Sequence, residues 1–120
     1  MEHPLAILIS AASLRDGEAG IISDLFEVGL QRFHLRKPDA TASEVAKLLG
    51  QIPDIYHGRI VLHRFPELIK DFSLCGYHHY SKEKLVETKG TISRSLHKLD
   101  ELKNLNEPLD YCFFGPVYES

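Results

Sequence analysis

The sequence contains few of the features that mark secreted, membrane-bound or redox-active proteins. Its only cysteines, Cys75 and Cys112, lie on separate apolar segments, which favours two reduced core thiols over a disulfide or a redox pair. The amino terminus carries no basic region, and the apolar run over residues 5–9 is too short for a signal-peptide core or a membrane span. We therefore expect a cytoplasmic protein with no membrane partner.

The sequence also lacks an excess of basic residues. Its 14 Lys and Arg against 17 Asp and Glu give a net charge of −3, and the basic residues do not cluster. This balance argues against a nucleic-acid partner. The first expected strand–helix junction, residues 10–17, has no Gly-x-Gly-x-x-Gly pattern, and no P-loop motif occurs anywhere. These absences argue against a dinucleotide or P-loop nucleotide site.

Apolar residues instead alternate between strand-like and helix-like segments. The 120 residues, 43% hydrophobic and 26% charged, suit one globular domain, and no linker divides residues 1–120. Continuous apolar runs predict buried strands at residues 5–9, 32–36, 59–63, 74–78, 91–95 and 111–114. Helical spacing, a capping box at 41–44 and a proline at 66 predict helices at 21–30, 41–52, from 66, at 81–86 and at 99–105.

Six strands separated by helices predict a parallel α/β sheet. Two architectures fit this pattern: an open doubly wound sheet, or a (β/α)8 TIM barrel of which only about the first six β/α units are present. A complete barrel typically needs about 200 residues or more, so 120 residues would not close one.

Histidines and cations gather where four consecutive predicted strands end. The groups are His34 with Arg36 and Lys37, His63 with Arg64, His78 with His79, and Ser95 with His97. Parallel α/β folds bind ligands at the carboxyl ends of their strands. The number of histidines allows a zinc site, but recognisable ligand spacing is missing. A cationic mouth for phosphate or diphosphate fits better, with Arg36 gripping two oxygens and Lys37 acting as a point charge.

Short motifs along nearly the whole chain resemble one family. They are Gly-Leu-x-x-x-x-Leu-Arg at 29–36, an apolar third strand, Gly-Tyr-His at 76–78, Ser-Leu-His at 95–97 and Phe-Gly-Pro-Val-Tyr-Glu-Ser at 114–120. In this order they resemble the thiamine-phosphate synthase superfamily, which includes the thiazole tautomerases. The resemblance implies a (β/α)8 barrel, with six of eight strands in this chain and the phosphate-binding loops of the last two beyond Ser120.

The resemblance also implies a reaction. In the synthase, hydroxymethylpyrimidine diphosphate loses diphosphate and the nitrogen of a thiazole phosphate captures the pyrimidine cation, in a site with basic residues and Mg²⁺. The family's Gln-Leu-Arg-Glu-Lys motif resembles residues 34–38 here. Arg36 is then a diphosphate ligand, His34 replaces the glutamine, and Lys37 is displaced by one position.

Further site residues follow from the same resemblance. Arg64 stands where a Mg²⁺-binding aspartate is expected, and Glu83 stands at the second metal carboxylate. A buried ion pair between Arg64 and Glu83 is the structural alternative, and it would exclude the metal. With His63, the remaining expected substrate-binding residues are Ser95, His97, Gly115 and Ser120.

Three hypotheses about function remain open from the sequence. The first is a thiamine-phosphate synthase or close relative that joins the phosphorylated pyrimidine and thiazole substrates. The second is a thiazole phosphate tautomerase, although Pro116 occupies the position of that branch's proton-transfer histidine. His34, His63 or His97 would then be the base. The third is a non-catalytic barrel that binds a pyrimidine or thiazole phosphate.

The resemblance also allows a homo-oligomer, although no surface stripe in the sequence indicates how it would form. A protein that truly ended at Ser120 would leave unpaired sheet edges, and we expect it to aggregate or to swap domains.

Overall fold

Six parallel strands form one sheet whose order in space follows the chain, β1-β2-β3-β4-β5-β6. The computed structural model describes residues 6–115. Its elements are β1 (Ile7–Ile9), α1 (Glu18–Glu27), β2 (Arg32–Leu35), α2 (Ala42–Gln51), a 3-10 helix (Asp54–Arg59), β3 (Ile60–Leu62), α3 (Glu67–Phe72), β4 (Gly76–His79), β5 (Thr91–Leu96), α4 (Leu99–Lys103) and β6 (Tyr111–Phe114).

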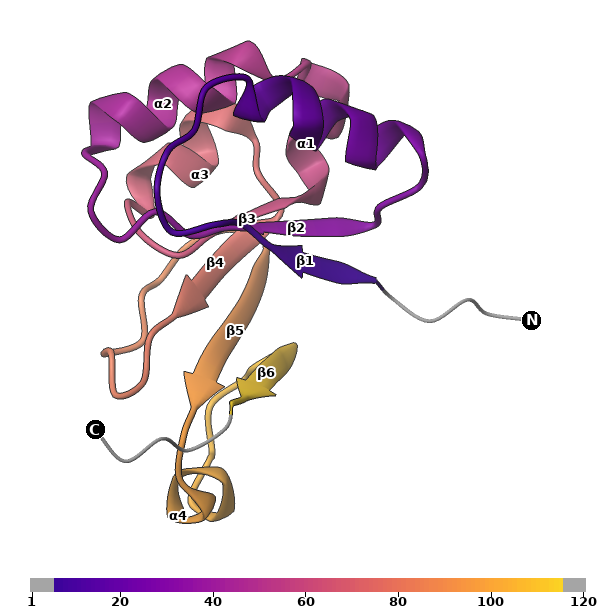
Figure 1. The fold of residues 1–120 in the computed structure, drawn as a ribbon. Coiled ribbons are helices and arrows are strands. Elements are labelled where there is room, and N and C mark those ends of the chain that lie inside the picture. Colours follow the sequence, from indigo (N-terminus) through magenta and orange to yellow (C-terminus); the bar gives the residue numbers. More distant parts are fainter. Residues whose placement is uncertain (1–5, 116–120) are drawn as a thin grey trace.

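The strand order distinguishes between the two predicted architectures. A doubly wound sheet reverses its direction of growth at a switch point, whereas this order never reverses. The sheet curls, and α1, α2 and α3 all cover the same side of it (Figure 1). The prediction of an α/β fold with about six β/α units of a barrel is therefore confirmed.

The hydrophobic core lies between the strands and these helices. Its buried members include Ile22 and Phe26 of α1, Leu48 and Leu49 of α2, and Leu62 of β3, all at most 5% exposed. Burial of one such side chain is worth about 1.5–3 kcal/mol. The helix-covered side of the sheet is therefore the one that holds the fold together, and we call it the outer face.

The predicted capping box opens α2 as expected. The backbone N–H of Glu44 donates to Thr41 Oγ1 over 3.1 Å, and the N–H of Thr41 donates to Glu44 Oε1 over 2.9 Å. The helix ends at Gln51, before Pro53, and the 3-10 helix that follows was not predicted. Its buried His57 lies with Nε2 2.9 Å from the carbonyl oxygens of both Leu49 and Ile52, so it satisfies the end of α2.

The predicted helix at residues 81–86 is wrong. Residues 80–90 connect β4 to β5 as a loop with one turn, in which the N–H of Glu83 donates to the carbonyl of Tyr80. Lys82 takes a positive φ of 68°, and Glu83 Oε1 accepts the N–H of Tyr80 over 3.0 Å. This side-chain contact with the backbone competes with helix formation.

The two edges of the described sheet are less buried than its centre. Ile9 of β1 is 47% exposed and Phe114 of β6 is 49% exposed, whereas all residues of β3 are buried. Cys75 and Cys112 are free thiols of intermediate burial. Within residues 6–115, no helix has the length and apolar character needed to cross a bilayer.

Candidate functional site

The side of the sheet that faces away from α1, α2 and α3 carries polar and aromatic side chains, and we call it the inner face. Strand register places His78 beside Ser93, and Ser95 beside Phe113. Residues two apart on a strand share a face. Direct contacts join the members of the inner face, which are His34, His63, His78, Ser93, Ser95, Tyr111 and Phe113.

A pocket of about 480 Å³ opens over the carboxyl ends of these strands. Its walls are Ile9, Arg36, Pro38, His63, Arg64, His78, Tyr80, Ser81, Ser95, His97, Phe113 and Gly115. Each strand from β1 to β6, or the residues just after it, contributes to this list. The pocket therefore stands where parallel α/β folds place their ligands.

Two arginines give the pocket its positive charge. Arg36 is exposed, and no hydrogen bond of its guanidinium to another described residue is formed. The guanidinium of Arg64 donates to the carbonyl oxygens of Pro38 and Ala40 and stacks over Phe65, with 4.5 Å to the ring centroid. Arg64 is thus held in place from behind, while Arg36 remains available for a bidentate contact with an anion.

Three histidines form a packed cluster beneath the arginines. His34 Nδ1 lies 2.7 Å from His63 Nε2, and His34 Nε2 lies 2.7 Å from the hydroxyl of Tyr111. The rings of His63 and His78 stack, with centroids 4.3 Å apart. His78 lies between two hydroxyls, with Nδ1 2.6 Å from Ser93 and Nε2 2.7 Å from Ser95.

These three rings are neutral at physiological pH. Burial is the main cause that lowers the pKa of each of them to about 3, and repulsion from neighbouring histidines and arginines lowers it further. For His34 the neighbours are His78 and Arg32, and for His63 they are His34 and Arg36. The cationic character of the pocket therefore comes from its arginines and not from the clustered histidines.

Lys37, expected beside Arg36 in the anion site, lies elsewhere. It is 2% exposed, and its Nζ is 2.5 Å from Glu18 Oε2. The same ammonium donates to the carbonyl oxygens of Ala11 and Ser13 over 2.7 and 2.8 Å. Strand alternation points Arg36 toward the pocket and its neighbour Lys37 away from it. Lys37 thus ties the β1–α1 loop to β2 and is not part of the pocket wall.

Glu83 forms no ion pair with Arg64, so the structural alternative of a buried pair between them is wrong. Glu83 Oε2 accepts the hydroxyl of Tyr77 over 2.8 Å, and its other oxygen accepts the N–H of Tyr80. No carboxylate lies among the described residues of the pocket wall. The described residues at positions 64 and 83 therefore do not fit a Mg²⁺ site, which needs oxygen ligands.

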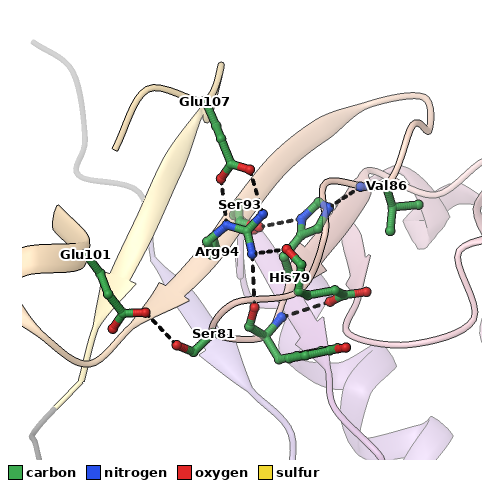
Figure 2. Close-up of polar contacts among 9 residues, drawn as sticks. His79, Ser81, Val86, Ser93, Arg94, Glu101 and Glu107 are labelled. Carbon is green, nitrogen blue, oxygen red and sulfur yellow. Dashed lines mark hydrogen bonds and ion pairs between the residues drawn. The ribbon is translucent and has the colours of Figure 1, made fainter. Parts of the chain in front are cut away.

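A polar clamp on the outer face fixes the β4–β5 loop that supplies Tyr80 and Ser81 to the pocket (Figure 2). The guanidinium of Arg94 pairs with both carboxylate oxygens of Glu107 over 2.7 and 2.9 Å, and it also donates to the carbonyl of Tyr80. His79 Nε2 accepts the N–H of Val86 over 2.8 Å. The Nδ1 of His79 must then carry the ring proton, and it donates this proton to the backbone carbonyl oxygen of Ser93.

A second contact secures the same loop to α4. The hydroxyl of Ser81 donates to Glu101 Oε2 over 2.8 Å, as Figure 2 shows. Glu101 also accepts the N–H groups of His97 and Lys98 over 3.0 and 2.9 Å. The backbone N–H of His97 is the main cause that lowers the pKa of Glu101, so this carboxylate stays charged. The contact holds Ser81 and the start of α4 at the rim of the pocket.

The structure groups most, but not all, of the predicted site residues. The pocket wall contains Arg36, His63, Arg64, Ser95, His97 and Gly115. His34 lies one layer below it, and Lys37 and Glu83 lie outside it. Ser120, like Pro116 and Glu119, falls outside the described residues. Sequence reasoning noted His78 at a strand end but did not select it, and the alternation that places it beside Ser93 and Ser95 was the available signal.

Comparisons with known proteins agree with the fold and the motifs. No family model matches the chain, and the search of curated proteins gave no significant match. Among solved structures, the chain is similar to a thiamine phosphate pyrophosphorylase from Bacteroides thetaiotaomicron, with 36% sequence identity and a TM-score of 0.83. The match covers 94% of this chain and 58% of that one. In fold, sequence and motif order the chain therefore resembles the thiamine-phosphate synthase superfamily, and it spans a little more than half the length of this pyrophosphorylase.

Proposed function

We propose that the protein is a thiamine-phosphate synthase-like transferase, which joins hydroxymethylpyrimidine diphosphate to a thiazole phosphate. The observation that carries the proposal is the pair of arginines, Arg36 and Arg64, in a pocket at the carboxyl ends of the strands. In the proposed reaction, the bond between the pyrimidine methylene carbon and the diphosphate oxygen breaks. The thiazole nitrogen then forms the new bond to that carbon, and diphosphate leaves with the electron pair.

The charge distribution of the pocket supports this chemistry. Departure of diphosphate needs positive charge at the leaving oxygens. The guanidinium of Arg36, which forms no hydrogen bond with residues 6–115, offers two parallel donors for a diphosphate. The anchored Arg64 offers further charge. Phe113 supplies an apolar wall near the same space, where a planar pyrimidine could lie. Serine and histidine side chains at positions 95 and 97 provide hydrogen-bonding groups on another wall.

The neutral histidines favour this transferase over the tautomerase alternative. A tautomerase must move a proton, and an effective base has a pKa near the working pH. Burial lowers the pKa of His34 and His63 to about 3, which makes them weak bases. The remaining candidate base is His97, which is exposed at the pocket wall.

The direct test is to incubate the full-length protein with hydroxymethylpyrimidine diphosphate and thiazole phosphate, with and without Mg²⁺, and to measure thiamine phosphate. We expect product, and we expect Arg36→Ala to lower kcat/KM about 100-fold, as loss of one charge-stabilising donor typically does. The exposed Arg15 lies outside the pocket wall, so Arg15→Ala is the matched control and should retain the activity. Absence of thiamine phosphate under every metal condition would refute the transferase.

The alternatives give different results in parallel experiments. A tautomerase would interconvert thiazole phosphate isomers, which NMR can follow, and His97→Ala would abolish that exchange. A non-catalytic barrel would bind a thiazole or pyrimidine phosphate in a calorimeter without turnover.

A further inference from the structure

The histidine cluster of the inner face has a geometry that the proposed transfer reaction does not use. His34 of β2, His63 after β3 and His78 of β4 each present a ring nitrogen, and these nitrogens all lie within 4.8 Å of one another. The three side chains come from β2, from the residue just after β3 and from β4, which are adjacent parallel strands of the sheet. Three imidazoles that converge from one side are the ligand set of a typical catalytic zinc site.

For His34 and His78, the ring nitrogens already have the partners that metal-bound histidines need. A ligating histidine usually donates its second N–H to a hydroxyl, carbonyl or carboxylate, which fixes the ring. If His34 binds through Nδ1, its Nε2 can donate to the hydroxyl of Tyr111 at 2.7 Å. Each ring nitrogen of His78 contacts one serine hydroxyl. Either nitrogen can therefore bind a metal while the other keeps its hydrogen bond to serine.

The protonation state of the cluster also suits a metal. Imidazole binds a metal only in its neutral form. Burial of His34 and His78, which are 0% and 1% exposed, disfavours their charged forms. His63 and His78 form part of the pocket wall, so a fourth coordination position would face the pocket and could take water or a phosphate oxygen.

We propose that His34, His63 and His78 form a binding site for a divalent transition metal of the zinc type, with its open position toward the pocket. The donor set selects this class because imidazole suits Zn²⁺ and Co²⁺, whereas Mg²⁺ and Ca²⁺ require oxygen ligands. The only alternative that the geometry offers is a purely hydrogen-bonded cluster, in which the His34–His63 contact of 2.7 Å contains a proton. A metal at His34 Nδ1 would require the ring proton to lie on Nε2, from where it can be donated to the hydroxyl of Tyr111.

The test is a calorimetric titration of Zn²⁺ into full-length protein that has been treated with a chelator. We expect one equivalent to bind, and Co²⁺ to give the visible absorption of a tetrahedral site. His63→Gln, at the pocket wall and only partly buried, should weaken binding by at least about 100-fold, more than the 10–100-fold typical of an outer-shell change. His97→Gln, in the same pocket but outside the cluster, should leave it unchanged.

A milder variant keeps the test decisive even where a histidine variant fails to fold. Tyr111→Phe removes only the hydroxyl beside His34 and should weaken Zn²⁺ binding about 10-fold. Absence of stoichiometric Zn²⁺ binding, or binding that His63→Gln and Tyr111→Phe leave unchanged, would overturn the proposal. Because no substrate enters these measurements, their outcome is independent of the transferase activity.

Discussion

The outer and inner faces of the sheet come from the same strands, yet they differ in chemistry. On β2, Phe33 and Leu35 point into the helix-covered core, while His34 between them joins the histidine cluster. On β5, Ser93 and Ser95 contact His78 on the inner face, while Arg94 pairs with Glu107 on the outer one. Strand alternation thus divides the molecule into a face that stabilises the fold and a face that builds the pocket.

The comparison shows that the polar side chains of the inner face can be buried at little cost in folding free energy. Within residues 6–115, every buried side-chain nitrogen and oxygen has a hydrogen-bond partner. Buried polar groups cost free energy mainly when they lack such partners. The inner face can therefore hold histidines and serines close together, while the apolar outer face supplies the stability. Variants on the two faces should accordingly have separable effects.

The largest expected effect is a loss of stability from the outer face. Leu49 of α2 is fully buried in the core, and Leu49→Ala should lower the free energy of unfolding by about 2–5 kcal/mol. Leu102→Ala, at a side chain that is 41% exposed, is the matched control and should cost less than about 1 kcal/mol. Chemical denaturation measures both, and equal losses would contradict the assignment of the core.

A second expected effect concerns the loop that carries the pocket rim. Gly90 has a φ of +90°, and a Cβ there would overlap the carbonyl oxygen of Cys75. Gly90→Ala should therefore destabilise the fold by at least about 1–2 kcal/mol, the cost of the left-handed conformation alone. Gly50→Ala is the control with opposite sign. Gly50 lies in α2 with open space around it, so the alanine should stabilise the helix by about 0.5–1 kcal/mol.

A third effect tests the ion pair of Arg94 and Glu107 in the clamp on the outer face. Glu107→Gln keeps the shape of the side chain but removes the charge that Arg94 contacts. Glu107 is 26% exposed at its side chain, so we expect a loss of only about 1 kcal/mol. Glu87→Gln, at an exposed position, should change nothing measurable by thermal unfolding. A loss as large as that of Leu49→Ala would mean that the clamp, and not the core, dominates.

The neutral histidines of the inner face should make the free energy of unfolding depend on pH. The folded-state pKa values of His34, His63 and His78 are about 3, below the value of 6.5 of an unfolded histidine. Between these values the unfolded chain binds more protons, so the stability from these neutral rings is complete above pH 6.5 and is lost as the pH falls toward 3. Unfolding of chelator-treated protein at several pH values measures the slope. His63→Gln should reduce it, and an unchanged slope would contradict the burial of the cluster.

The sequence predicted the outer face better than the inner one. All six strands and the capping box of α2 follow from apolar periodicity and local motifs, because those signals lie within a few residues of each other. Periodicity left the barrel and the doubly wound sheet both open, and the resemblance to a known family indicated the barrel. The helix expected at 81–86 failed because a tertiary contact, Glu83 with Tyr77, favours a loop that periodicity does not encode. Lys37 was misplaced for a similar reason, since its partner Glu18 lies on another element.

The grouping of residues around the pocket could be predicted where strand ends alone determine it. Ser95 lies near the end of β5, Arg36, His63, Arg64 and His97 come just after strands, and all five meet in one pocket. The cluster of His34, His63 and His78 could not be predicted as a unit, because its members are far apart in the chain and depend on strand register. Register is a property of the whole sheet, which one strand's sequence does not specify.

Calorimetric titration of inorganic diphosphate into the full-length protein tests most directly whether the inner face binds the anion of the proposed reaction. We predict that the unmodified protein binds diphosphate, and that Arg36→Ala and Arg64→Ala each weaken this binding about 10–100-fold. The free energy of unfolding of each variant should stay within about 1 kcal/mol of that of the parent. Arg15→Ala should bind normally. Diphosphate affinity that is equal in the parent and both pocket variants would contradict the account.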